Sequence, residues 1–172
     1  MTPDLVRLKE KFGQLGQLVE ALELELVDDP SWAQPSDTSY LSEKDRLNPD
    51  IMANVEAMAA TNRLIAWFGR DMEGYLGLWR GPKELPLELA PVVQLDSEGQ
   101  YSIVASTIPN YLAIAWSEEA FERASLALVK VGFTVAGSPE AIAEATEAYD
   151  SPNDYRHRLY NEGRVRRGLQ PV

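Results

Sequence analysis

The chain contains no cysteine and a single histidine, His157. Without cysteine, a disulfide framework, a thiolate zinc cluster and a cysteine nucleophile are excluded. The histidine lies among arginines in YRHRLY (residues 155–160), where we expect an exposed side chain on a helix surface. No G-x-S-x-G, G-x-x-x-x-G-K-[ST] or G-x-G-x-x-G motif occurs. The sequence therefore favours neither a serine hydrolase triad nor a phosphate-binding loop, and indicates no cofactor.

Long apolar runs are also missing, and none approaches the roughly 20 residues that a membrane-spanning helix needs. The first residues, MTPDLVRLKEKFG, carry charges throughout, unlike a signal peptide. The 172 residues, 45% of them hydrophobic and 25% charged, suit one folded domain. We expect a soluble, cytoplasmic protein with no membrane partner.

Basic residues are few, with 16 lysines and arginines against 27 acidic residues and a net charge of −11. This charge repels nucleic acid, so we expect no nucleic-acid partner. Residues 1–154 carry a net charge of −15 and residues 155–172 a net charge of +4. The acidic part is suited to a basic protein partner. The basic end predicts a solvated tail, one folded back on the acidic part, or a contact for an acidic partner.

The first half of the chain is predicted to be helical with one long loop. Leucines at three- and four-residue steps predict a helix over about residues 3–27, interrupted near Gly13 and Gly16. Residues 28–47 are rich in proline, serine and aspartate, as loops are, and contain two aromatic residues that either hold the loop down or face a partner, Trp32 and Tyr40. Asn48 before Pro49 is typical of a helix start, and the helix is predicted to reach Asn62.

Strands follow, and then helices. Apolar runs separated by turn residues predict two hairpins, with strands at residues 64–69, 75–80, 91–96 and 101–106. Capping residues followed by proline predict helices that start near residues 107, 138 and 151, with another restarting near 117, and Gly163 is expected to end the last helix. This order predicts an α+β fold, in which N- and C-terminal helices cover a largely antiparallel meandering sheet of four or more strands.

Four acidic residues lie in the two predicted hairpin turns: Asp71, Glu73, Asp96 and Glu98. If the hairpins are neighbours, these carboxylates gather at one end of the sheet. Such a group can bind Ca²⁺ or Mg²⁺, or supply a general acid and base. Aspartate and glutamate beside glycine are also ordinary turn residues, and we favour this interpretation.

Aromatic residues are the other candidate contacts, because they anchor protein interfaces through their large buried area. Three of them flank the first predicted turn: Trp67, Tyr75 and Trp79. Alternation along a strand directs some of these side chains into the core and others outward.

Two segments resemble the SUKH superfamily, which includes fungal regulators of cell-wall synthesis and bacterial immunity proteins. They are LIAWFGRDMEGYLGLW (residues 64–79) and PVVQLDSEGQYSIVASTIPNYL (residues 91–112). The positions that match and that we expect to be structural are Phe68, Gly69, Gly74, Pro91 and Gly99. Other matching positions are Asp71, Val92, Val93, Asp96, Glu98, Ala105, Ser106 and Leu112.

The resemblance implies an α+β scaffold without an active site that binds proteins; bacterial members commonly neutralise a toxin encoded beside them, often a nuclease. It implies one SUKH-like domain over residues 1–172, with a divergent helical part at 1–63 and a basic helix and tail at 155–172. We therefore expect a non-enzymatic protein that masks a basic partner. The alternatives are a carboxylate-based, metal-assisted hydrolase and a self-associating scaffold.

Overall fold

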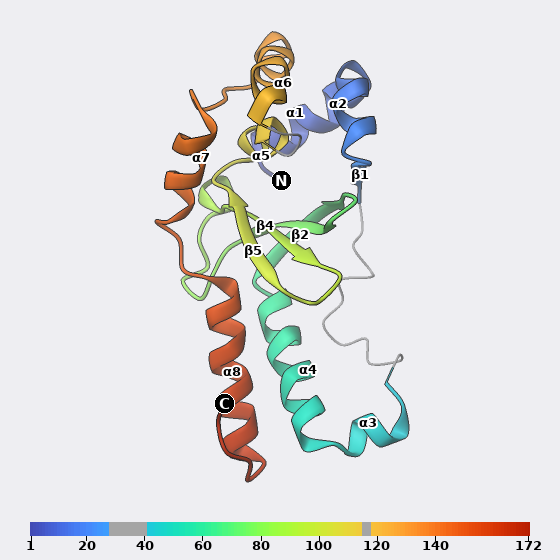
Figure 1. Ribbon diagram of the computed structural model, residues 1–172, viewed down its shortest axis with the longest axis vertical. Coiled ribbons are helices and arrows are strands. Elements are labelled where there is room, and N and C mark those ends of the chain that lie inside the picture. Colours follow the sequence, from blue (N-terminus) through green and yellow to red (C-terminus); the bar gives the residue numbers. More distant parts are fainter. Residues whose placement is uncertain (28–40, 115–117) are drawn as a thin grey trace.

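The computed structural model describes residues 1–27, 41–114 and 118–172 (Figure 1). In these residues, five strands form one antiparallel sheet with neighbours in chain order. The strands are β1 (Glu25–Leu26), β2 (Ile65–Arg70), β3 (Gly74–Trp79), β4 (Val92–Asp96) and β5 (Tyr101–Ala105). Together with the helices, the sheet confirms the predicted α+β fold. In the described part of the chain, no helix is both long and apolar enough to cross a membrane.

The N-terminal segment is broken where the glycines predicted an interruption, but its helical part is shorter than expected. Helix α1 (Pro3–Lys11) continues as a 3-10 turn (Phe12–Leu15) into α2 (Gly16–Ala21). The predicted helix to residue 27 is wrong beyond α2, because Glu23 has a φ of 49° that is incompatible with a right-handed helix. The chain then enters β1, which pairs with β2.

The capping signals predicted the starts of the two helices that pack together below the sheet. The Asn48 side chain accepts the N–H of Asp50 at 2.9 Å and starts α4 (Pro49–Asn62), which follows the short α3 (Glu43–Leu47). The Ser151 hydroxyl accepts an N–H at the start of α8 (Pro152–Arg166). The expected stop at Gly163 is wrong, because α8 continues past it.

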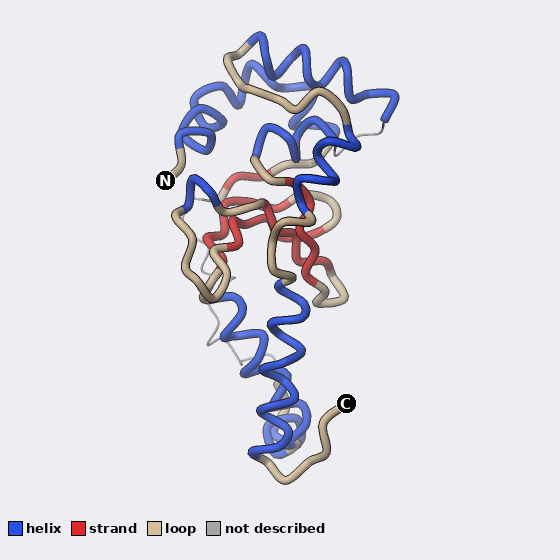
Figure 2. The backbone as a smooth tube through the Cα atoms, turned by 90° about the vertical axis from the view of Figure 1, so that its left-hand side faces the viewer, coloured by secondary structure: helices blue, strands red, loops and turns tan. Residues whose placement is uncertain are grey.

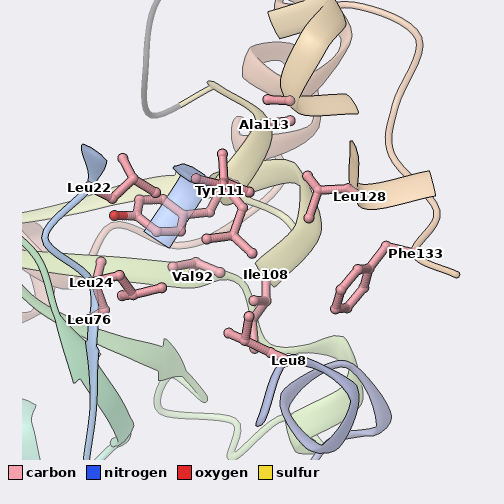
Figure 3. Packing of buried hydrophobic residues seen from close by; sticks show 14 of the residues in the cluster. Leu8, Leu22, Leu24, Leu76, Val92, Ile108, Tyr111, Ala113, Leu128 and Phe133 are labelled. Atoms are coloured by element: carbon pink, nitrogen blue, oxygen red, sulfur yellow. The ribbon is translucent and has the colours of Figure 1, made fainter. Parts of the chain in front are cut away.

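The main core lies between one face of the sheet and the helices α1, α2, α5 (Ile108–Ile114), α6 (Glu118–Lys130) and α7 (Pro139–Thr146). Figure 3 shows its large apolar side chains, with the Tyr111 ring among Leu22, Val92 and Ile108. Phe68, Leu76 and Leu112 are at most 2% exposed. Burial of this apolar surface is the main driving force for forming the fold.

The opposite face of the sheet carries a smaller apolar cluster, which Tyr155 of α8 joins. Beyond it, α4 and α8 run side by side away from the sheet (Figures 1 and 2). We call residues 41–63 and 152–172 the arm, and residues 1–27 and 64–151 the head. The arm contacts the β4–β5 turn, where Asn153 of α8 donates its side-chain amide to the side-chain oxygen of Gln100 at 3.3 Å.

Candidate functional site

The turns of the β2–β3 and β4–β5 hairpins lie next to each other. Gly74 pairs with Asp96 and Tyr75 with Leu95 in the register of β3 and β4, so each turn follows directly from a paired position. Between the turns is a shallow depression of about 280 Å³. We call the residues that line it the turn surface: Arg70, Asp71, Met72, Glu73, Gly74, Tyr75, Leu95, Asp96 and Ser97. Three of the four predicted carboxylates line it, and Glu98 does not.

Asp71 fixes the first turn through both carboxylate oxygens. Its Oδ1 accepts the backbone N–H groups of Glu73 at 2.9 Å and Gly74 at 2.8 Å. Gln94 of β4 donates its side-chain amide to Oδ2 at 2.9 Å, and the Tyr111 hydroxyl of α5 donates to the same oxygen. One carboxylate thus joins the turn to the neighbouring strand and to a helix of the main core.

Tyr111 supplies a buried hydroxyl to this network and is 3% exposed. Burial raises the pKa of Tyr111 well above its ordinary value, and the hydrogen bond to Asp71 and the negative charges of Asp71 and Glu73 raise it further. The hydroxyl therefore remains protonated and a donor throughout the physiological range.

Asp96 has the same function in the second turn. Its Oδ1 accepts the N–H groups of Glu98 at 2.9 Å and Gln100 at 2.8 Å. Gly99 completes the turn with a φ of +78°, a conformation that glycine adopts without strain. The turn interpretation of the sequence is therefore confirmed for both aspartates.

The residues expected to be structural from the SUKH-like segments do have structural surroundings. A Cβ atom at Gly74 would lie 2.1 Å from the carbonyl oxygen of Leu95, so only glycine allows β3 to approach β4 here. A Cβ at Gly69 would lie 2.6 Å from the carbonyl oxygen of Glu25. Phe68 and Pro91 are buried in the core.

The other two predicted carboxylates, Glu73 and Glu98, are exposed. Met72 is part of the turn that Asp71 fixes, lines the depression, and is 64% exposed. The one cation of the turn surface, Arg70, forms an ion pair with Glu25 at 2.8 Å. The turn surface therefore combines a net negative charge with one large exposed apolar side chain.

The chemistry of these carboxylates follows from their partners. The oxygens of Asp71 are occupied by two backbone N–H groups, one amide and one hydroxyl, so they are poorly placed to accept a proton from a substrate or to coordinate an ion. No grouping of three or more histidine, aspartate or glutamate side chains suited to a metal ion occurs within residues 1–27, 41–114 and 118–172. What the arrangement offers is a preformed acidic surface.

The predicted aromatic contacts have different environments. Trp67 and Tyr75 are half-buried on the sheet face opposite the main core, with their rings edge to face and centroids 6.5 Å apart. Trp79 is a correction to the candidate contacts, because it is 1% exposed and its indole N–H donates to the carbonyl of Asp150 at 2.9 Å. Trp32 and Tyr40 lie outside the described residues.

The sequence interpretation missed three residues of this site, Met72, Gln94 and Tyr111. Met72 stands between two acidic turn residues, and that position in the turn is itself a signal for exposure. Gln94 breaks an otherwise apolar strand, which is a signal for a polar partner on the same face. Tyr111 gave no such signal, because nothing local shows which buried tyrosine meets a carboxylate.

No protein-family model matches this sequence, and comparison with curated proteins and with solved structures finds no match. The resemblance to the SUKH superfamily stays a prediction.

Proposed function

We propose that this chain is a non-enzymatic protein-binding module, of the kind the SUKH resemblance implies, and that its turn surface binds a basic protein. The observation that carries the proposal is the use of Asp71 and Asp96 inside their own turns. Because these carboxylates hold the backbone, Glu73, Glu98 and Met72 project from a rigid base.

Such a base favours tight association, because little conformational entropy is lost on binding. The negative charge of the head steers a cationic partner and raises the association rate. Methionine adapts its shape to the surface it meets, and the exposed Met72 of the turn surface is suited to be the apolar anchor. A nuclease that presents its substrate-binding groove has the basic charge that this surface complements.

Photo-crosslinking in the native cell tests the proposal. A p-benzoylphenylalanine placed at Met72 is expected to capture one basic protein. The matched control position is Leu126 on α6, which is 71% exposed against 64% for Met72. Capture at both positions, or at neither, would contradict the proposal.

Charge reversal then separates the charge of the two hairpin turns from the overall charge. The double variant Glu73→Lys with Glu98→Lys is expected to lose the captured partner. The control variant Glu144→Lys with Glu147→Lys changes the net charge equally at exposed positions on and after α7. We expect the control to retain the partner, with a dissociation constant that rises with salt. Equal loss in both variants would show that the turns have no special part in binding.

A further inference from the structure

The residues after α8 turn back along the helix (Figure 2). Gly168 has a φ of +76° and reverses the chain. The N–H of Val172 donates to Oδ1 of Asn161 at 2.7 Å, and Nδ2 of Asn161 donates to the main-chain oxygen of Val172 at 2.9 Å. Arg164 donates its Nε–H to the carbonyl oxygen of Gln170 at 2.7 Å. The basic end of the chain is therefore folded back on its own helix.

All of these contacts are made to main-chain atoms of the returning segment. The side chains of Gln170, Pro171 and Val172 are exposed, and that of Val172 is 67% exposed. A carboxamide that accepts the N–H and binds the oxygen of one residue recognises an extended backbone as a neighbouring strand does. The recognition consequently does not depend on which side chains the bound segment carries.

The three helix side chains that contact the segment lie on one face of α8. Nε2 of His157 is 3.1 Å from the same main-chain oxygen of Val172, so His157, Asn161 and Arg164 recur at helical spacing. Beside them is a concave surface of about 580 Å³. It is lined by Arg158, Asn161, Glu162, Val165 and Arg166. Val165, one of these lining residues, is 58% exposed, so there is room beside the segment for further contacts.

We propose that His157, Asn161 and Arg164 form a binding site for an extended peptide segment, and that residues 170–172 occupy this site as an intramolecular strap. The strap is held by exposed hydrogen bonds, which contribute little stability individually, so a peptide can replace it. The site is on the arm and does not depend on the function proposed for the turn surface.

Binding of two fluorescein-labelled peptides to the full-length chain, followed by anisotropy, tests the proposal. One peptide has the sequence of the strap, Gly-Leu-Gln-Pro-Val, and the other replaces its side chains, Gly-Ala-Ala-Pro-Ala. The variant Val172→Pro removes the N–H that Asn161 accepts and leaves α8 intact. We expect it to bind both peptides about fivefold more tightly than the unmodified chain, because the competing strap has lost one hydrogen bond.

Two further variants test whether the site binds the main-chain atoms of the peptide and not its side chains. Val172→Ala keeps the N–H and removes most of an exposed side chain, and we expect it to bind as the unmodified chain does. Adding Asn161→Ala to Val172→Pro is expected to weaken binding about tenfold or more, because two hydrogen bonds to the peptide are lost. Equal binding by Val172→Pro and Val172→Ala, binding that survives loss of Asn161, or no binding to Val172→Pro up to millimolar peptide would each overturn the proposal.

Discussion

In the head, the side chains that meet between the layers are large and apolar, whereas in the arm an alanine and a glycine lie at the contact between the two helices. Ala53 and Ala57 of α4 are at most 2% exposed, and Gly163 of α8 lies against Ala53. Small residues bring the helix axes close together but bury little apolar area. We conclude that the head has the larger share of the hydrophobic stabilisation.

The two regions also differ in charge. The head carries 8 basic and 18 acidic residues, and the arm carries 8 basic and 6 acidic residues. In the arm, ion pairs between Arg164 and Asp50 and between Arg167 and Glu56 join α8 to α4. The positive and negative charges of the arm therefore largely balance each other, whereas the head has a large excess of negative charge. This difference predicts where substitutions and salt have their largest effects.

The largest effect is expected in the head. Leu112 on α5 is 0% exposed, so Leu112→Ala removes apolar contacts and leaves a cavity. We expect the free energy of unfolding in urea to fall by about 2–5 kcal/mol. Leu126→Ala is the control, because Leu126 is 71% exposed. Its effect is expected to stay within about 0.5 kcal/mol, and a comparable loss in both variants would contradict the assignment of the core.

Removing one hydroxyl tests the link between the head core and the turn surface. In Tyr111→Phe, the Asp71 carboxylate loses the donor that ties it to α5. Hydrogen bonds to charged groups contribute about 1.5–3 kcal/mol, and we expect a loss of that size in urea unfolding. A loss below about 0.5 kcal/mol would show that the turn is held without α5.

The variant Tyr111→Phe is also expected to change how the free energy of unfolding depends on pH. Since the pKa of Tyr111 is raised in the folded state, its contribution to stability is complete below the unfolded pKa of about 10 and is lost as pH rises above it. The unmodified chain should therefore lose about 1.4 kcal/mol between pH 8 and pH 11 that Tyr111→Phe does not lose. The difference in the free energy of unfolding between the unmodified chain and Tyr111→Phe therefore becomes smaller as the pH rises from 8 to 11. Parallel pH profiles would exclude Tyr111 as the group responsible.

A smaller effect is expected where the arm helices touch. A Cβ atom at Gly163 would lie 3.2 Å from the Cβ and 3.4 Å from the Cα of Ala53, so Gly163→Leu forces the helices apart. We expect a loss of about 1–3 kcal/mol, because overpacking exceeds a gain in helix propensity of about 1 kcal/mol. Val165→Leu, at an exposed position of the same helix, is expected to be neutral in thermal unfolding. Stabilisation by Gly163→Leu would show that the contact is loose.

The smallest effect concerns the charges at the edge of the arm. Glu56→Gln removes the partner of Arg167, and the two side chains are 50% and 23% exposed. Pairs of this exposure contribute about 0.2–1 kcal/mol, and we expect a loss in that range that disappears near 1 M salt. Glu144→Gln on α7 is the control with an exposed side chain. A salt-independent loss would mean that the residue acts through packing.

Much of this fold was predictable because its signals are local. Asn48 followed by Pro49, and Ser151 followed by Pro152, mark helix starts through groups only a few residues apart. The alternation along β2 to β5 depends on immediate neighbours in the same way. The short β1 had no such signal, since its pairing partner β2 is distant in the sequence.

The errors arise where a residue's role is set by a distant segment. Gly163 was expected to stop a helix, yet it is retained inside α8 because Ala53 approaches it across the arm. Trp79 was a candidate surface contact, yet its side chain is buried and its indole N–H donates to the main-chain carbonyl of Asp150. For the site, the turn roles of Asp71 and Asp96 were predictable, and the contribution of Tyr111 was not.

The contact between α4 and α8 also has a consequence for the order in which the chain folds. The strands β2 to β5 pair with their chain neighbours and are joined by connections of at most 12 residues, whereas the two arm helices are separated by about 90 residues. Contacts between distant segments form late in folding, so we expect the arm to assemble onto an already structured head. Substitutions at Gly163 should then accelerate unfolding and leave the refolding rate almost unchanged.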